Sequence, residues 1–124
     1  MSIVTLTHEE IIKQANSYIK SDDIINLEAY YEYLYDNYVE YNEEYIYQKV
    51  FLYACTVGAK ECIKWLFSIY DDLDQINQIS IRQMFFYGKY LIQFYKHPNI
   101  LDFYENFLNE RRMKIEENIK IKNK

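Results

Sequence analysis

The chain has 124 residues, of which half are hydrophobic, and its 19 acidic residues outnumber its 14 basic ones to give a formal net charge of -5. The hydrophobic content argues against a disordered chain, and the presence of only two Gly and one Pro argues against a turn-rich β-sandwich. One all-α domain with a modest core is therefore predicted.

The first predicted hairpin spans residues 7–41. The stretch THEE at residues 7–10 has the capping-box form, in which the Thr hydroxyl and the second Glu carboxylate each satisfy a free backbone N–H. It predicts a helix over about 8–20. The stretch SDD at residues 21–23 then interrupts that helix and supplies N-caps for a second helix over about 23–41.

The second predicted hairpin spans residues 42–72 and has the clearest helical pattern of the chain. Asn42 is an N-cap candidate for a third helix, and Gly58 separates that helix from a fourth. The fourth helix is predicted to be amphipathic, because its apolar residues share one face at helical spacing. That face consists of Ala59, Cys62, Ile63, Leu66, Ile69 and Tyr70.

The third predicted hairpin spans residues 78–118 and follows a connection over residues 71–77. The stretch SIRQ at residues 80–83 is a second capping box and opens a fifth helix that runs to about Tyr95. Pro98 then falls in the first turn of a sixth helix, where its missing N–H costs nothing. The apolar face of the sixth helix consists of Ile100, Leu101, Phe103, Tyr104, Phe107, Leu108 and Ile115.

The three hairpins show a repeat, with shifts of 39 and then 38 residues. Its columns are Ala15, Ala54 and Ile92; Ile24, Ile63 and Leu101; Leu27, Leu66 and Tyr104; and Tyr30, Ile69 and Phe107. We therefore expect about six helices in three stacked helical hairpins, which would form a short solenoid. The predicted organisation is a single helical-repeat domain over residues 1–120 with a frayed basic tail over residues 119–124.

The stretch LYACTVGAKECIKWLF at residues 52–67 resembles the core of an ankyrin repeat. The likeness lies in a pair of small residues, a Gly shortly after them, and a later acidic residue followed by aliphatic ones. The resemblance implies that Ala54 and Cys55 let two helices approach closely and that Gly58 ends the first helix in a left-handed turn. It also implies that the seam between repeats is filled by Ile63, Leu66 and Phe67.

The chain departs from the ankyrin pattern in three ways. No repeat opens with Thr-Pro-Leu-His, the period is nearer 38 residues than about 33, and Lys96-His97 stands where the third hairpin would have Gly. The chain therefore resembles a degenerate, ankyrin-like array. Divergent arrays in sequences this rich in Ile, Asn, Lys and Tyr are similar to those of amoebal giant viruses and their virophages, so a viral protein is expected.

The sequence contains no motif of the common catalytic or phosphate-binding classes, such as HExxH, GxSxG or a Gly-rich loop. His8 lies beside an N-cap and His97 lies at a turn, so both are predicted to be surface or capping residues. Cys55 and Cys62 have no second pair, which fits neither a zinc site nor a disulfide framework, and they are predicted to be small buried hydrophobes. We expect no enzyme, no metal and no cofactor.

No apolar run approaches the roughly 18 residues of a membrane span, and the first ten residues lack the features of a signal peptide. The sequence thus predicts a cytoplasmic, intracellular protein without membrane contact. Nucleic acid is not expected as a ligand, because only the last fourteen residues are basic and the chain as a whole is acidic.

Two functions remain open. The first is an ankyrin-like, non-enzymatic protein–protein interaction module, whose stacked hairpins present a groove to another protein. The second is an acidic inhibitor that mimics nucleic acid and occupies a basic cleft of a nucleic-acid-processing protein. Weak self-association through the first hairpin is also expected, since the side of that hairpin away from the stack carries tyrosine.

Both functions depend on the stretch AYYEYLYDNYVEYNEEYIY at residues 29–47, which contains eight tyrosines, five carboxylates and no Lys or Arg. A helical wheel places Tyr31, Tyr35 and Tyr38 on the core side. The cap at Asn42 assigns the last two tyrosines to the next helix. The candidate partner-binding surface therefore consists of Tyr30, Tyr33, Tyr41, Glu32, Asp36 and Glu40.

Overall fold

The protein is described by a computed structural model over residues 5–73 and 75–122, with side chains described over residues 5–73 and 77–111. These residues form six helices and no strand, which confirms the all-α prediction. The helices are α1 (His8–Ile19), α2 (Ile24–Asp36), α3 (Glu43–Val57), α4 (Lys60–Asp72), α5 (Gln75–Phe94) and α6 (Pro98–Lys122).

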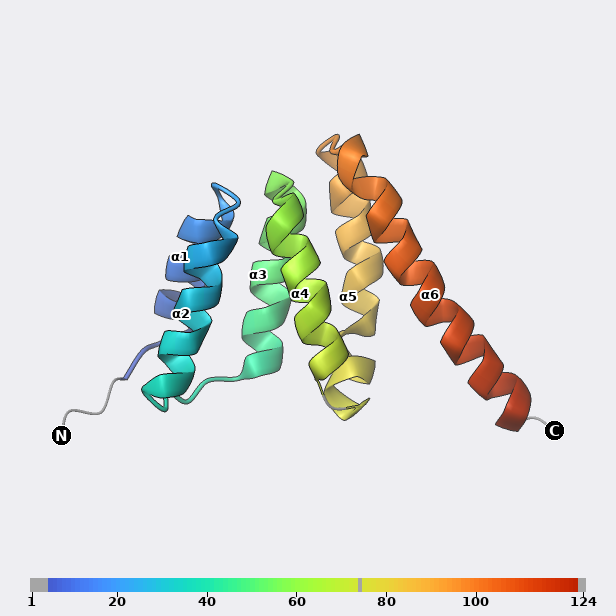
Figure 1. The fold of residues 1–124 in the computed structure, drawn as a ribbon, viewed down its shortest axis with the longest axis horizontal. Coiled ribbons are helices and arrows are strands. Elements are labelled where there is room, and N and C mark those ends of the chain that lie inside the picture. The colour runs from blue at the N-terminus through green and yellow to red at the C-terminus, as the bar shows by residue number, and fades with distance from the viewer. Residues whose placement is uncertain (1–4, 74, 123–124) are drawn as a thin grey trace.

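The helices pair into three hairpins that lie side by side (Figure 1). The first helices of the hairpins form one layer, in which α3 packs against both α1 and α5. The second helices form the other layer, in which α2 packs against α1 and α4, and α6 packs against α5. We call them the first-helix layer and the second-helix layer, and the core lies between them.

The turn inside each hairpin has the same backbone geometry. Asp22, Gly58 and Lys96 adopt left-handed conformations, with φ values of 54°, 74° and 59°. The N–H of the next residue then bonds to the carbonyl five residues earlier, at 2.9 to 3.0 Å, in all three turns. This is the Schellman arrangement that often ends a helix, and Gly is its usual left-handed residue. The third hairpin therefore makes with Lys96 the turn that the second makes with Gly58.

These turns set the register of the repeat. The left-handed residues are 36 positions apart between the first and second hairpins and 38 apart between the second and third. The spacing of the second and third turns equals the predicted shift of 38, whereas the spacing of the first and second turns differs from the predicted shift of 39. Leu27, which is fully buried, is the counterpart of Ile63, whereas Ile24 is only half-buried. Apolar residues are so frequent here that several registers align them, and only the turns distinguish the correct one.

The helix α2 ends at Asp36, earlier than the predicted end near Tyr41. The side-chain amide of Asn37 donates to the Tyr33 carbonyl at 2.8 Å, and Tyr38 then turns the chain with a φ of 53°. This turn repeats the five-residue backbone bond of the hairpin turns. The chain therefore leaves the helix one turn before the apolar pattern stops.

Two of the three tyrosines assigned to the core lie at the surface. Tyr35 and Tyr38 are 83% and 89% exposed, so their prediction as core residues is wrong. Tyr38 lies beyond the end of the helix, and Tyr35 lies outside the narrow stripe that α2 buries, which contains Leu27 and Leu34. Tyr31 does pack inward, since the residue is half-buried and its hydroxyl is fully buried.

The helix α5 begins at Gln75, earlier than the predicted start at Ser80. The Ser80 hydroxyl donates to the Asn77 carbonyl at 3.0 Å, inside the helix, so Ser80 is not an N-cap. The predicted connection over residues 71–77 is correspondingly short, because α4 continues to Asp72.

The apolar faces predicted for the fourth and sixth helices are largely buried. On α4 only Ile69 of the predicted face is half-buried, and on α6 only Leu101 and Phe103 are. The side chain of Ile115 lies outside the described residues, as do the side chains of the predicted basic tail over 119–124.

Aromatic rings fill the core where the second and third hairpins meet. Phe67 of α4 stacks on Phe107 of α6, with ring centroids 3.8 Å apart and planes 5° apart. The buried Tyr104 hydroxyl donates to the Phe85 carbonyl at 2.6 Å. Gly88 permits this arrangement, because a Cβ at that position would meet the Tyr104 hydroxyl.

Polar side chains join neighbouring hairpins at the turn end of the stack. Asp22 bonds to the first turn of α4, where Cys62 is one of its two partners. The imidazole of His97 lies 3.0 Å from the Thr56 carbonyl and packs over Gly58, where a Cβ would come within 2.6 Å of the ring. His97 is thus a capping residue at a turn, as predicted.

The opposite end of the stack is joined in the same way. The imidazole of His8 accepts a hydrogen bond from the Asn42 N–H at 3.1 Å, which links the starts of α1 and α3. Arg111 of α6 pairs with Asp71 of α4. Each junction between hairpins therefore has a polar link at both of its ends.

Candidate functional site

The predicted partner-binding residues do not form one surface. Tyr30 and Tyr33 stack with ring centroids 6.1 Å apart, and Tyr18 of α1 tilts against Tyr30 at the same distance. They line an open groove of about 740 Å³ between α1 and α2, which we call the N-terminal groove. Its remaining lining residues are Leu6, Glu10, Lys13, Gln14, Ser17, Asn26 and Ala29.

The predicted carboxylates Glu32 and Asp36 lie on a different surface. They line an open groove of about 490 Å³ between α2 and α4, which we call the α2–α4 groove. The other lining residues are Glu28, Tyr31, Tyr35 and Trp65. Adjacent helix positions point about 100° apart, so the tyrosines and the carboxylates of one short segment face two different sides of α2.

Tyr41 and Glu40 lie in the connection between α2 and α3. Glu40 is exposed, and Tyr41 is half-buried against the core. Burial, with a smaller contribution from the charge of Glu43, raises the pKa of Tyr41 to about 12. The six predicted residues are therefore distributed over two grooves and a loop.

The structure also shows an exposed aromatic surface that the sequence reasoning missed. Tyr87, Tyr90 and Phe94 of α5 stack in series, with centroid separations of 6.3 Å and 6.1 Å, and Tyr95 meets Phe94 edge-on at 5.0 Å. All four side chains are between 48% and 62% exposed. We call them the α5 ladder. The spacing of three and four residues between Tyr87, Tyr90 and Phe94 could have indicated that they share one helix face. The buried face of α5 is also apolar, so the sequence does not show which of the two faces is exposed.

The ladder occupies one end of the exposed face of the first-helix layer. The register of the turns gives each ladder position a counterpart on the other first helices. For Tyr87, Tyr90 and Phe94 the counterparts on α3 are Lys49, Leu52 and Thr56. Those in the first hairpin are Lys13 and Asn16 of α1 and Lys20 just after it. This face therefore changes from polar and basic at α1 to aromatic at α5.

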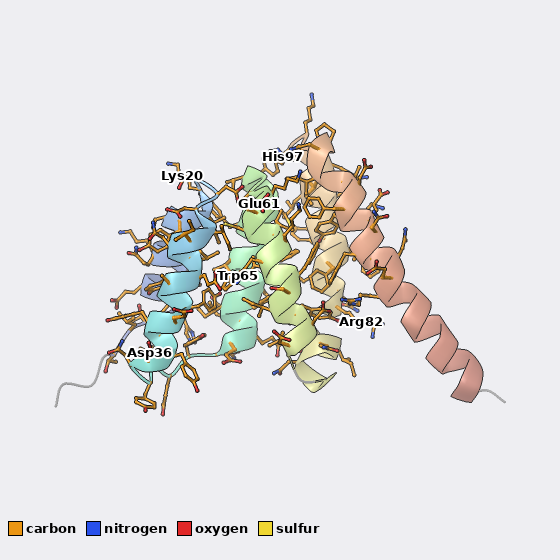
Figure 2. The ribbon with its side chains drawn as sticks, viewed as in Figure 1. Lys20, Asp36, Glu61, Trp65, Arg82 and His97 are labelled. Atoms are coloured by element: carbon orange, nitrogen blue, oxygen red, sulfur yellow. The ribbon has the colours of Figure 1, made fainter. Side chains whose placement is uncertain are left out.

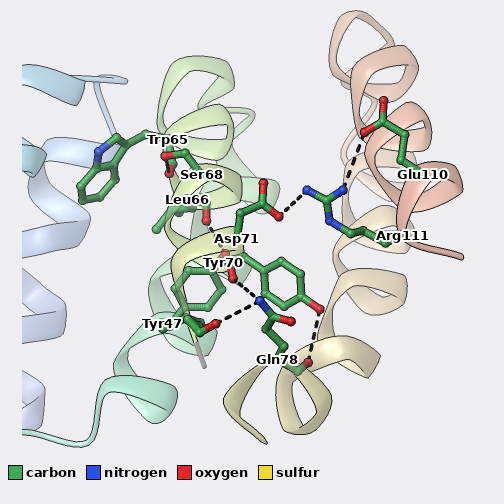
Figure 3. A network of polar contacts seen from close by, with 10 residues as sticks. Tyr47, Trp65, Leu66, Ser68, Tyr70, Asp71, Gln78, Glu110 and Arg111 are labelled. Carbon is green, nitrogen blue, oxygen red and sulfur yellow. Dashed lines mark hydrogen bonds and ion pairs between the residues drawn. The ribbon is translucent and has the colours of Figure 1, made fainter. Parts of the chain in front are cut away.

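A polar network closes the junction of α4, α5 and α6 (Figure 3). The side-chain amide of Gln78 donates to the carbonyls of Tyr70 and Leu73 at 3.2 and 3.0 Å, and the Tyr70 hydroxyl donates back to the Gln78 carbonyl at 3.4 Å. The Arg111 guanidinium lies 4.7 Å from the centre of the Phe107 ring. These side chains hold three helices together, and their donors and acceptors are used within the fold.

The reactive side chains of the described residues are also used structurally. Cys55 and Cys62 are buried and unpaired, as predicted. Burial raises the pKa of both thiols, to about 12 for Cys62. Both imidazoles bond to backbone groups of a neighbouring hairpin. Within the described part of the chain, no three His, Cys, Asp or Glu side chains come together as a metal-binding group.

Comparison with known proteins identifies no relative. The chain matches no family model, no curated protein and no solved structure. No helix in the part of the chain that the structure describes has the length and apolar character to cross a membrane.

Proposed function

We propose that the chain is a non-enzymatic protein-interaction module made of three ankyrin-like hairpins, and that a partner protein docks on the α5 ladder. The observation that carries this proposal is a series of four exposed rings in contact, three of them stacked along α5 and the fourth, Tyr95, edge-on just after its end. Aromatic side chains bring a large apolar area into an interface and dominate binding energy where they are buried by a partner.

The ladder is rigidly supported from behind. Ile81, Phe85 and Ile92 of the same helix are fully buried in the core, so the exposed rings project from a fixed scaffold. A helix face that is already ordered loses little entropy when a partner binds. None of the four rings lines the grooves described above, and a row of exposed rings along a helix suits a protein partner better than a small molecule.

The charges beside the ladder favour an amphipathic helix with acidic flanks as the partner segment. Lys49 lies at the counterpart position on α3, and Lys96 follows the ladder in the turn. Among the described residues, neither ammonium group has a carboxylate partner. An apolar stripe on the partner would cover the rings, and its acidic flanks would meet the two lysines.

The ankyrin-like part of the proposal is supported by the turn at Gly58 and by the complete burial of Ala54 and Cys55 between helices. A cytoplasmic location is supported by the two unpaired thiols, since cysteines in oxidising compartments are usually paired.

The test compares affinity capture by three forms of the chain in its native cellular context. The ladder variant carries Tyr90→Ser and Phe94→Ser, and the control carries Ile25→Ser and Tyr38→Asn, two exposed side chains outside both grooves and the ladder. A protein retained by the original chain and the control should be lost with the ladder variant. Once purified, the captured protein should bind the ladder variant at least about 30-fold more weakly than it binds the original chain, as expected for interface hot spots. Equal capture by all three forms would remove the proposal.

The second candidate function, the acidic inhibitor that mimics nucleic acid, is favoured by one observation. Glu28, Glu32 and Asp36 form a carboxylate row on the surface of α2 and have no ion-pair partner within the described part of the chain. Such an inhibitor should bind its target steeply less well as salt rises, and nucleic acid should compete with it. If nucleic acid does not compete with the chain for the target at low salt, this second function is ruled out.

A further inference from the structure

We infer that the α2–α4 groove binds an arginine side chain carried by a basic segment of a partner protein. This inference rests on the chain being an interaction module, but it concerns a different surface from the α5 ladder. The inference assigns a ligand chemistry to Glu32 and Asp36, which the sequence analysis predicted to bind a partner. It adds Trp65, which the sequence analysis did not include.

The groove has one acidic wall and one aromatic wall. Glu28, Glu32 and Asp36 are four positions apart in turn, so a helical rise of 1.5 Å per residue spaces them by about 6 Å along α2. Trp65 comes from α4 and projects toward the first hairpin (Figures 2 and 3). The Tyr31 ring meets the indole nearly edge-on, at a centroid distance of 5.1 Å and an angle of 71°.

The acidic wall has no cation of its own. No Lys or Arg occurs from residue 21 to residue 48, and none of the three carboxylates forms an ion pair with a described residue. Like charges four positions apart destabilise a helix by about 0.2 to 0.5 kcal/mol per pair. A bound cation would relieve this repulsion at both pairs.

A second feature of the groove is independent of charge. Tyr31 lines the groove, and its hydroxyl is buried without a hydrogen-bond partner among the described residues. The hydroxyl is covered by protein atoms, so Tyr31 presents its ring to the groove and forms the aromatic wall together with the Trp65 indole.

Arginine fits the two walls better than the other cations. Its planar guanidinium can stack on an indole or phenol ring while its N–H groups donate to carboxylates beside the ring. Lysine offers a compact charge without a planar face. The groove carboxylates are not part of any group of three described side chains suited to a metal ion, and their charge repels nucleic acid.

Trp65 is the only tryptophan of the chain and therefore reports directly on this groove. The full chain is titrated with the acetylated peptide Gly-Arg-Gly-Arg-Gly and with its Lys and Asp counterparts, while Trp65 emission is followed. The arginine peptide should change the emission saturably and bind at least about fivefold more tightly than the lysine peptide, because only the guanidinium can stack. The aspartate peptide should not bind.

The groove variant carries Glu28→Gln, Glu32→Gln and Asp36→Asn, and the matched control carries Glu9→Gln, Glu110→Gln and Asp102→Asn. Both lose the same charge, and only the first loses it in the groove. Affinity for the arginine peptide should fall at least about tenfold in the groove variant and stay within about twofold in the control. Helix content measured by circular dichroism verifies that both are folded.

Three results would overturn the inference: equal weakening in the two variants, equal affinity for the arginine and lysine peptides, or no saturable change at Trp65. The ladder variant should bind the arginine peptide as the original chain does. If the arginine peptide does not bind but the ladder still captures its partner, this inference alone is rejected. If the peptide binds but the ladder captures no partner, the proposed role of the ladder alone is rejected.

Discussion

The carboxylate of Asp22 accepts a hydrogen bond from the Cys62 backbone N–H at 3.0 Å, across the junction between the first and second hairpins. A second bond runs from the Glu61 N–H at 3.2 Å. The residue before α4, Ala59, has no side chain that could cap the helix. Asp22 therefore performs from the neighbouring hairpin the role of an N-cap.

Substitutions at Asp22 should separate the cap from the left-handed backbone. Asp22→Ala loses the cap and places a Cβ-bearing residue without a local hydrogen bond at positive φ, so the free energy of unfolding should fall by about 2 to 3 kcal/mol. Asp22→Gly loses only the cap and should cost about 1 kcal/mol. Urea denaturation followed by circular dichroism measures both. An alanine variant as stable as the original chain would show that the bond contributes nothing.

Gly88 and Tyr104 should be energetically coupled. Gly88→Ala should cost about 2 kcal/mol, because the new methyl group meets the Tyr104 hydroxyl in a packed core. Tyr104→Phe should cost about 1 kcal/mol, because the buried hydrogen bond from the Tyr104 hydroxyl to the Phe85 carbonyl is lost. The double variant should be more stable than the sum of the two costs predicts, by about 1 kcal/mol or more. Strict additivity in urea denaturation would contradict the packing described.

The two thiols should be protected in the folded chain. Cys55 and Cys62 are fully buried, and burial raises the pKa of both, so little thiolate is available at neutral pH. Reaction with a thiol reagent such as 5,5′-dithiobis(2-nitrobenzoate) should therefore be at least about 100-fold slower in buffer than in urea. A thiol that reacts equally fast in both solutions would disprove its burial.

Alkaline pH should destabilise the fold through its buried tyrosines. Burial raises the pKa of six of them above the value near 10 that applies to the unfolded chain: Tyr30, Tyr31, Tyr41, Tyr47, Tyr70 and Tyr104. Because the unfolded chain loses these protons first, stability is complete below pH 10 and falls as the pH rises toward the folded values, about 12 for Tyr41.

Absorbance at 295 nm measures tyrosine ionisation, and the native chain should retain protonated tyrosine at a pH where the chain in urea has none. The urea concentration at which half of the chain is unfolded should decrease as the pH is raised from about 10 to about 12. Superimposable titration curves in the two solutions would mean that these hydroxyls are not buried.

The starts of α1, α3 and α6 were predictable because their determinants are local, whereas the start of α5 was not. The Thr7 hydroxyl accepts from the Glu10 N–H at 3.1 Å, and Asn42 accepts from the Tyr45 N–H at 3.0 Å, as their sequence patterns indicate. Pro98 begins α6 as predicted. Each of these features involves residues within three positions of one another, so the sequence alone contains the whole interaction.

Helix ends and exposed faces were harder to predict, because they depend on distant residues. Tyr38 takes a left-handed conformation that no pattern assigns to tyrosine, and this ends α2 early. The exposure of Tyr87 and Tyr90 on α5 follows from which side of that helix packs against α3 and α6. In a chain with 15 tyrosines, tyrosine by itself distinguishes neither core from surface nor one surface from another.

The polar links at both ends of each hairpin junction bear on how the chain unfolds. Separating the first hairpin breaks the bond of Asp22 and the bond between His8 and Asn42 together, and separating the third breaks those of His97 and Arg111. In a repeat array, strong coupling between neighbours relative to the stability of single repeats makes melting all-or-none. The three hairpins should therefore unfold in a single cooperative transition, with no stage at which one hairpin remains folded alone.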